Sequence, residues 1–149
     1  MRLPRLYAIL DTGFLPGSEA LYATAQELVA AGCTLLQYRD KSENARVMLE
    51  HARELKKRVG SSARLIMNDR ADLCLAAGFD GVHVGQGDLS PESVRKIIGP
   101  DRWLGVSTHN PEQLREADLT SADYLAIGPV FATSSKQTPD PVVGLEGVR

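Results

Sequence analysis

Two aspartates follow short apolar runs on either side of a segment with helical composition. Asp69 comes after residues 65–67, Asp88 comes after residues 82–84, and the Ala- and Leu-rich segment 71–77 lies between them. The order strand, helix, strand predicts a parallel βαβ unit. Because the carboxyl ends of parallel strands meet at one edge of a sheet, both carboxylates are expected at the same rim. Two converging carboxylates can hold a hard divalent cation.

Basic side chains follow other apolar runs. Arg39 and Lys41 come after residues 33–38 and alternate along an extended segment, so their side chains share one face. Lys136 lies in a polar loop, 133–136, beyond the run 124–127. Arginine offers a planar fork of donors and lysine a point charge, and both bind phosphate oxygens. These cations therefore indicate an anionic, phosphate-bearing ligand.

The same residues also have structural interpretations. Asp69 can cap the helix that follows it, and Asp88 can shape the turn before Ser90. Arg39 and Lys41 are also typical of a solvated strand end. Taken one at a time, these residues leave both interpretations open.

Strand-like and helical segments alternate along the whole chain, and this alternation predicts the fold. Strands are expected over 6–10, 33–38, 65–67, 82–84, 103–106 and 124–127, and helices over 19–31, 44–59, 71–77, 91–98 and from 111. Ser18, Ser90 with Pro91, and Asn110 with Pro111 are predicted helix starts. Apolar strands alternating with helices indicate a parallel sheet covered by helices.

Such a sheet can be arranged in two ways, as a closed (β/α)8 TIM barrel or as a doubly wound open sheet. No GxGxxG follows any predicted strand, and polar residues follow every strand after the first. Both observations favour the barrel. A barrel of eight units typically needs about 250 residues, so the 149 residues predict about six of the eight units. The expectation is a single, incomplete TIM-barrel domain over 1–149, in a chain truncated at its C-terminal end.

Composition and charge exclude several classes of partner. The net charge of −2 gives no general attraction to nucleic acid or to an anionic membrane. No apolar run approaches the ~20 residues of a membrane span. Cys33 and Cys74 are far apart and form no CxxC motif, so neither a disulfide scaffold nor a zinc site is indicated. A cytoplasmic protein with small-molecule substrates is expected, and a homo-oligomer stays open.

Five short motifs at successive strand ends resemble those of one enzyme family. They are QYRDK at 37–41, NDRADL at 68–73, GVHVGQGDL at 81–89, GVSTHN at 105–110 and GPVFATSSK at 128–136. In this order they resemble the thiamine-phosphate synthase family, over nearly the whole chain. The resemblance implies a (β/α)8 barrel that uses Mg²⁺. It also implies the reaction of hydroxymethylpyrimidine diphosphate with thiazole phosphate to give thiamine phosphate and pyrophosphate.

The resemblance also assigns residues to roles, position by position. Asp69 and Asp88 match the Mg²⁺ ligands of the family. The expected substrate-binding residues are Gln37, Tyr38, Arg39, Asp40, Lys41, Asn68, Ser107, Thr133, Ser134, Ser135 and Lys136. Residues 133–135 match the loop that contacts the thiazole phosphate. Gln37, Arg39, Lys41, Asn68, Ser107 and Lys136 match contacts of the pyrimidine diphosphate, and Tyr38 and Asp40 belong to the same QYRDK motif. Arg39, Lys41, Ser107 and Lys136 are the expected catalytic residues.

The chemistry of diphosphate departure explains why such residues suffice. Stabilising the negative charge of the leaving group is the largest expected catalytic effect, and no side chain has to act as a nucleophile. Two other functions were kept open. One is a thiazole tautomerase on the same scaffold, and the other is a non-catalytic phosphate-binding barrel fragment, for which turnover would be weak or absent.

Overall fold

A computed structural model describes residues 2–133 and 140–148, and its centre is a parallel six-stranded sheet in the order β1-β2-β3-β4-β5-β6. The strands are Ala8–Asp11, Leu35–Arg39, Arg64–Asn68, Gly81–Val84, Trp103–Thr108 and Tyr124–Ile127. The helices are α1 Ser18–Ala30, α2 Ala45–Val59, α3 Ala71–Ala77, α4 Pro91–Ile98 and α5 Pro111–Asp118, and a 3-10 turn, η1, spans Glu146–Val148. The predicted order of strands and helices is confirmed.

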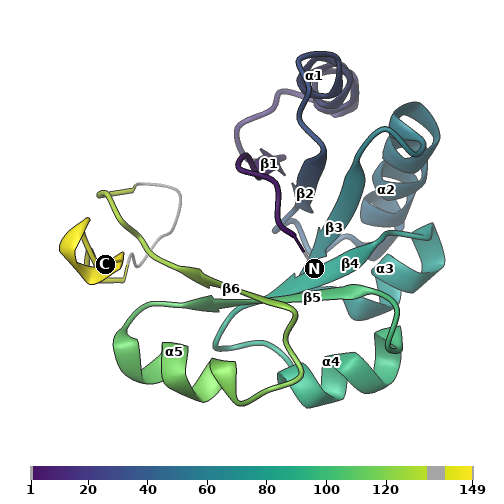
Figure 1. Cartoon of the computed structure of the whole chain (residues 1–149). Helices are drawn as coiled ribbons and strands as arrows, with labels where there is room; N and C mark the ends of the chain where they lie inside the picture. Colours follow the sequence, from purple (N-terminus) through teal and green to yellow (C-terminus); the bar gives the residue numbers. More distant parts are fainter. Residues whose placement is uncertain (1, 134–139, 149) are drawn as a thin grey trace.

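The sheet curves into a half-barrel, and the five α-helices lie on its outer side (Figure 1). Each strand pairs in parallel with the next strand along the chain, from β1 to β6. No strand is inserted between sequence neighbours, so the described sheet has no point at which the strand order reverses. The α/β class is confirmed, and the eight-unit barrel stays a prediction.

Alternation along the strands divides the sheet into two chemically different faces. Leu36 and Tyr38 of β2 and Val82 of β4 belong to the apolar core between sheet and helices. Gln37 and His83 alternate with them and therefore face the inside of the half-barrel. The outer face is covered by α1 to α5, whereas the inner face carries four of the predicted site residues, Gln37, Arg39, Asn68 and Ser107.

Three helices begin with side-chain caps, two of which, Ser90 and Asn110, the sequence predicts. Asn44 accepts a hydrogen bond from the Val47 N–H at 3.3 Å, and Ser90 and Asn110 do the same for α4 and α5. Helix α1 differs from the prediction, because Ser18 is its first helical residue and Gly17 occupies the cap position without a side-chain hydrogen bond. These caps set the residue at which each loop after a strand ends and the next helix begins.

Candidate functional site

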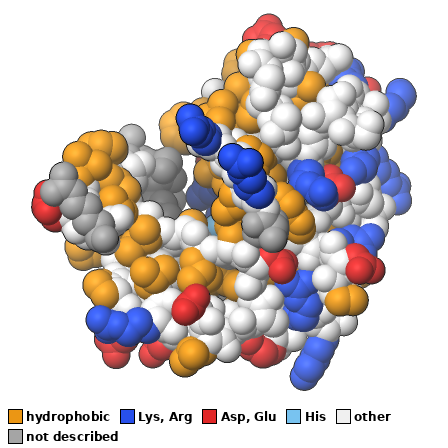
Figure 2. Space-filling model, viewed as in Figure 1, with side chains coloured by type: hydrophobic (Ala, Val, Ile, Leu, Met, Phe, Trp, Pro, Cys, Tyr) orange, Lys and Arg blue, Asp and Glu red, His pale blue; other side chains and the backbone are white. Residues whose placement is uncertain are grey.

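A cavity of about 460 Å³ opens on the inner face of the sheet, a size within the range of small-molecule sites. Its walls come from β1 to β6 and from the loop after β1. The lining residues are Tyr7, Ile9, Asp11, Phe14, Gln37, Arg39, Asn68, His83, Ser107 and Ala126. Figure 2 shows this side of the molecule hollowed between the segment after β6 and the N-terminal strands, with hydrophobic side chains at its border. Gln37, Arg39, Asn68 and Ser107 were predicted from the sequence, and the structure brings them together here.

Asp69 has an unusual backbone at the end of β3. Its φ is 61°, and the Arg70 N–H donates to the Asn68 carbonyl at 2.7 Å across it, which forms a tight γ-type turn. The Asp69 N–H donates to the His83 carbonyl of β4 at 2.8 Å. Helix α3 has no side-chain cap, so Asp69 does not serve as one. The sheet thus holds a strained aspartate whose carboxylate is not used for capping.

Asp88 closes the turn after β4, as its structural interpretation predicts. One of its carboxylate oxygens, Oδ2, accepts from the Gly85 N–H at 2.7 Å. Burial and the neighbouring Asp69 carboxylate raise the pKa of Asp88, against the opposing effects of the Gly85 N–H and of Lys41. The two aspartates therefore lie near each other, and the Asp69 carboxylate disfavours the charged form of Asp88.

Cations lie beside these carboxylates. The Lys41 ammonium lies 2.5 Å from Asp69 Oδ2, and Arg39 Nη1 is paired with Asp11 Oδ2 at the end of β1. The strand ends of β1, β2 and β3 thus place opposite charges beside one another along one rim, and the end of β4 adds the Asp88 carboxylate next to Asp69. Such a rim can exchange its internal ion pairs for contacts with an anion and a cation that bind together.

The aspartate pair fits Mg²⁺ by its donor chemistry. Mg²⁺ prefers oxygen ligands and is usually held by one or two carboxylates with phosphate oxygens and water. Across residues 2–133 and 140–148, no group of three or more His, Cys, Asp or Glu could hold a metal ion. A metal bound by Asp69 and Asp88 therefore needs further oxygens, which a diphosphate supplies.

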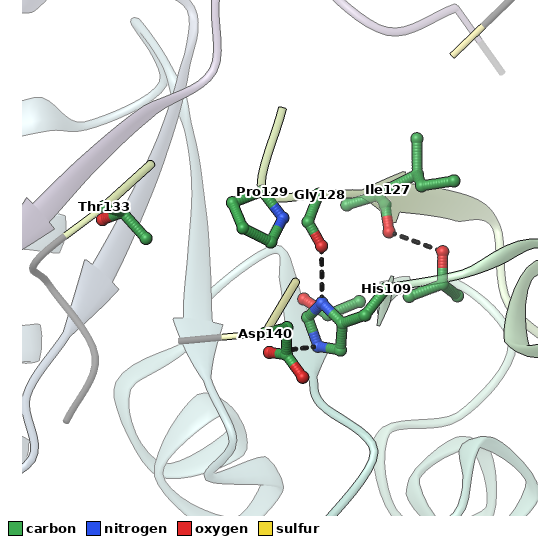
Figure 3. Close-up of a pocket in the computed structure, with 9 residues that line it drawn as sticks. His109, Ile127, Gly128, Pro129, Thr133 and Asp140 are labelled. Atoms are coloured by element: carbon green, nitrogen blue, oxygen red, sulfur yellow. Dashed lines mark hydrogen bonds and ion pairs between the residues drawn. The ribbon is translucent and has the colours of Figure 1, made fainter. Parts of the chain in front are cut away.

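A second, smaller cavity of about 200 Å³ lies at the end of β5 and β6 (Figure 3). The His109 ring points between two oxygens there, with Nδ1 2.6 Å from the Gly128 carbonyl and Nε2 3.4 Å from Asp140 Oδ2. Ser107 and Thr133 also line this cavity. His109 therefore links the end of β5 to the segments that follow β6.

Two of the predicted substrate contacts lie elsewhere. Tyr38 is fully buried on the helix side of β2, and its hydroxyl donates to Asp40 Oδ2 at 3.0 Å and lies 3.0 Å from His51 Nδ1. Asp40 also accepts from the Ser42 N–H. The structure does not bring Tyr38 and Asp40 to the inner face, because successive residues of an extended segment point to opposite sides.

The loop after β6 is described only in part. Thr133 lines the smaller cavity. The predictions for Ser134, Ser135 and Lys136 fall outside the described residues.

Several residues of the large cavity were not among the predicted site residues. Tyr7, Asp11 and His83 line it, and Tyr124 reaches His83 from β6. Burial lowers the pKa of His83 to about 4, against a smaller opposite effect of Asp88, so its imidazole is neutral near pH 7. The period-two pattern of each strand could have assigned Tyr7 and His83 to the inner face, but sequence alone does not give the side of the sheet.

Similarity to known proteins was assessed from the sequence and from the fold. The family model described as thiamine monophosphate synthase matches residues 6–149. A thiamine-phosphate synthase of Koribacter versatilis is 59% identical over 152 residues, which cover 100% of this chain and 72% of the relative. The corresponding protein of Shouchella clausii is 44% identical, over 93% of this chain and 66% of its own length.

A solved structure has the same fold. The thiamine phosphate pyrophosphorylase of Pyrococcus furiosus superposes with a TM-score of 0.79 at 33% identity, over 95% of this chain and 66% of that protein. The chain thus spans about two thirds to three quarters of the length of these relatives. No helix in the described part of the chain is long and apolar enough to cross a membrane.

Proposed function

The chain belongs to the thiamine monophosphate synthase family, and on this premise we propose that it forms thiamine phosphate from hydroxymethylpyrimidine diphosphate and thiazole phosphate. Pyrophosphate is the second product. The observation that carries the proposal is the rim of paired charges, where Arg39 and Lys41 lie beside Asp11 and Asp69 and next to a cavity of about 460 Å³. This rim suits a ligand that joins an uncharged ring to a diphosphate.

Two regions of the inner face divide the substrate between them in this proposal. The large cavity, with Gln37 and Asn68 in its wall, receives the aminopyrimidine ring. Arg39, Lys41 and Lys136 bind the diphosphate and stabilise the charge that develops as it leaves. Thr133, Ser134 and Ser135 bind the thiazole phosphate, which places the ring nitrogen beside the carbon that loses the diphosphate.

The metal-binding role is part of the same proposal. Asp69 and Asp88 would hold Mg²⁺ together with diphosphate oxygens, and the ion would neutralise negative charge on the leaving group. Their closeness supports this role, because a cation shared by two neighbouring carboxylates offsets the repulsion by which Asp69 raises the pKa of Asp88. Lys41 is the side chain that shares the rim with them and contributes the remaining positive charge.

The bond changes need no nucleophile from the protein. The carbon–oxygen bond to the diphosphate breaks, the electron-rich aminopyrimidine carries the positive charge, and the thiazole nitrogen forms the new carbon–nitrogen bond. The residues of the chain orient both rings and hold the departing group. The named relatives favour this synthase over the tautomerase and over a non-catalytic phosphate-binding protein.

A turnover assay with a charge-removing series tests the proposal. The protein is given both substrates, and pyrophosphate and thiamine phosphate are measured with Mg²⁺ and with a chelator. Asp69→Asn and Asp88→Asn are expected to lower turnover by two or more orders of magnitude, about the size of effect of losing one charge-stabilising group. Asp72→Asn, which removes an exposed partner of Arg70 on α3, is the matched control. Product formation that is undiminished by the chelator or in both site variants would contradict the proposal.

A further inference from the structure

Five side chains on the inner face of the sheet form one continuous hydrogen-bonded chain. Gln37 Nε2 donates to the Tyr7 hydroxyl at 2.7 Å, and the hydroxyls of Tyr7 and Tyr124 lie 3.0 Å apart. The Tyr124 hydroxyl lies 3.1 Å from His83 Nδ1, and His83 Nε2 lies 2.8 Å from Ser107 Oγ. These hydrogen bonds join Gln37 to Ser107, two residues that the family resemblance assigns to the pyrimidine diphosphate.

The donor and acceptor chemistry of these side chains fixes the direction of each hydrogen bond between them. The Gln37 amide nitrogen can only donate, so the Tyr7 oxygen accepts and its own hydrogen is free for Tyr124. Tyr124 then passes its hydrogen to His83 Nδ1. A neutral imidazole that accepts at Nδ1 carries its hydrogen on Nε2, and this hydrogen points to Ser107 Oγ.

The opposite tautomer of His83 leaves the half-buried Tyr7 hydroxyl without an acceptor among these five side chains. A hydrogen on Nδ1 would turn the Tyr124 hydrogen toward Tyr7, whose oxygen already accepts from Gln37. The Tyr7 hydroxyl hydrogen would then have no acceptor among the five hydrogen-bonded side chains. Tyr7 is half-buried, so a hydroxyl hydrogen without a protein acceptor there costs free energy, and the Nε2-protonated form, in which the Tyr7 hydrogen has an acceptor, is favoured.

Gly105 makes the link between Tyr124 and His83 possible. Residues 83, 105 and 124 are neighbours in register across β4, β5 and β6. A Cβ atom at position 105 would lie 2.1 Å from Tyr124 Cζ and 2.5 Å from His83 Nδ1. The Tyr124 side chain can therefore reach His83 across β5 because Gly105 has no side chain in its path.

We propose that Tyr124 and Tyr7 are positioning residues that keep His83 in its Nε2-protonated tautomer and thereby make Ser107 a donor toward the cavity. With its oxygen occupied by His83, Ser107 directs its own hydrogen to an acceptor oxygen of a bound ligand. The class of acceptor, a phosphate oxygen of the substrate, rests on the proposed function. The tautomer itself does not, because it follows from side chains of this protein alone.

The first test reads the tautomer directly. ¹⁵N NMR of histidine-labelled protein near neutral pH, with His83 assigned by the loss of its signals in His83→Gln, distinguishes a protonated Nε2 from a protonated Nδ1. In the unaltered protein Nε2 is expected to carry the hydrogen. Tyr124→Phe should shift His83 toward a mixture of tautomers, and Tyr22→Phe, a buried tyrosine on α1, should not. A hydrogen on Nδ1 in the unaltered protein, or no change in Tyr124→Phe, would overturn the proposal.

The second test is a double-mutant cycle on turnover. Tyr124→Phe is expected to lower kcat about tenfold or more with KM changed by no more than about twofold, since it removes an effect on charge development rather than on ring binding. In a Ser107→Ala background the same change should have no further effect, because its target is gone. An equal loss in both backgrounds would overturn the proposal. If the unaltered protein shows no turnover, the proposed function fails while the tautomer measurement still decides this inference.

Discussion

The Lys41 ammonium lies 2.5 Å from the Asp69 carboxylate, so a cation predicted to bind diphosphate is paired with a carboxylate predicted to bind metal. The Lys41 side chain is 56% exposed, and exposed ion pairs contribute little to stability, about 0–1 kcal/mol. The pair therefore matters for binding and charge balance far more than for folding. The contribution of Lys41 to activity can therefore be tested separately from its contribution to stability.

Replacing Lys41 with methionine should remove activity without unfolding the protein. Lys41→Met keeps most of the side-chain length and removes the charge, so turnover is expected to fall by about two orders of magnitude. The free energy of unfolding in urea should change by less than about 1 kcal/mol. Lys57→Met, at an exposed ion pair with Glu54 on α2, controls for the loss of one surface charge. A loss of several kcal/mol in Lys41→Met would show that the pair is structural.

Two substitutions of Asp69 should separate its charge from its backbone. Both Asp69→Asn and Asp69→Ala remove the carboxylate and should abolish Mg²⁺-dependent turnover. Asparagine tolerates the positive φ of 61° much better than alanine does, for which left-handed backbone costs about 1–2 kcal/mol. Urea denaturation should therefore find Asp69→Ala less stable than Asp69→Asn by about 1 kcal/mol. Equal stabilities would mean that the turn relaxes when the residue changes.

Gly105→Ala should destabilise the inner face. Its Cβ would overlap the Tyr124 ring and the His83 imidazole, and overpacking of this kind costs about 1–3 kcal/mol. Gly87→Ala is the matched control, because a Cβ at position 87 would meet nothing within 4 Å. Thermal unfolding of both variants measures the difference. A Gly105→Ala protein as stable as the control would contradict the packing of Tyr124 over β5.

The buried Asp40 should make stability depend on pH. Burial opposes its charged form, but hydrogen bonds from Ser42 and the Tyr38 hydroxyl outweigh burial and hold the pKa of Asp40 below its ordinary 3.8. The unfolded chain therefore binds the proton more readily, so the stabilisation is fully present above pH 3.8 and is lost as pH falls through the folded-state value. Asp40→Asn should be less stable than the unaltered protein near neutral pH, and the gap in urea denaturation should narrow in acid. A gap that widens in acid would reverse this interpretation.

The thiol of Cys74 should be inert in the folded protein. The side chain is fully buried and burial raises its pKa to about 11, so almost no thiolate exists near neutral pH. Alkylation by iodoacetamide, followed by mass spectrometry, should leave Cys74 unmodified in the native protein. Complete modification is expected after unfolding in urea. Rapid labelling of Cys74 in native protein would contradict the burial of α3 against the sheet.

The regular part of the fold was predictable because its signals are local. Helix α3 was predicted at its observed limits. Asn44 and Ser90 cap their helices, and asparagine and serine are residue types commonly found at this position. The convergence of Asp69 and Asp88 was also predictable, since parallel strands with helical connections bring successive strand ends to one rim. Strand limits were shifted by one or two residues, as for Leu35–Arg39, where the apolar run starts before the pairing does.

The buried polar contacts were not predictable from local pattern. Tyr124 begins a strand, where an aromatic side chain is most simply expected to pack in the core, yet its hydroxyl lies 3.0 Å from that of Tyr7, 117 positions away in sequence. Such contacts depend on curvature and register across several strands, which no single strand encodes. Tyr38 and Asp40 were predicted to contact the substrate because they belong to the motif QYRDK. A motif conveys which residues are neighbours in sequence, whereas the pleat decides which of them face the same side.

The division of the half-barrel into a covered outer face and an open inner face separates two kinds of mutational risk. Substitutions of strand residues that face the helices, such as Leu36 or Val82, disturb the packing of the helices on the sheet and lower the stability of the whole domain. Changes on the inward rows mainly alter what the molecule recognises, as long as the crossing at Gly105 is kept. Directed evolution toward a new ligand could therefore draw its library from inward positions near the strand ends and leave the outward rows as a constant scaffold.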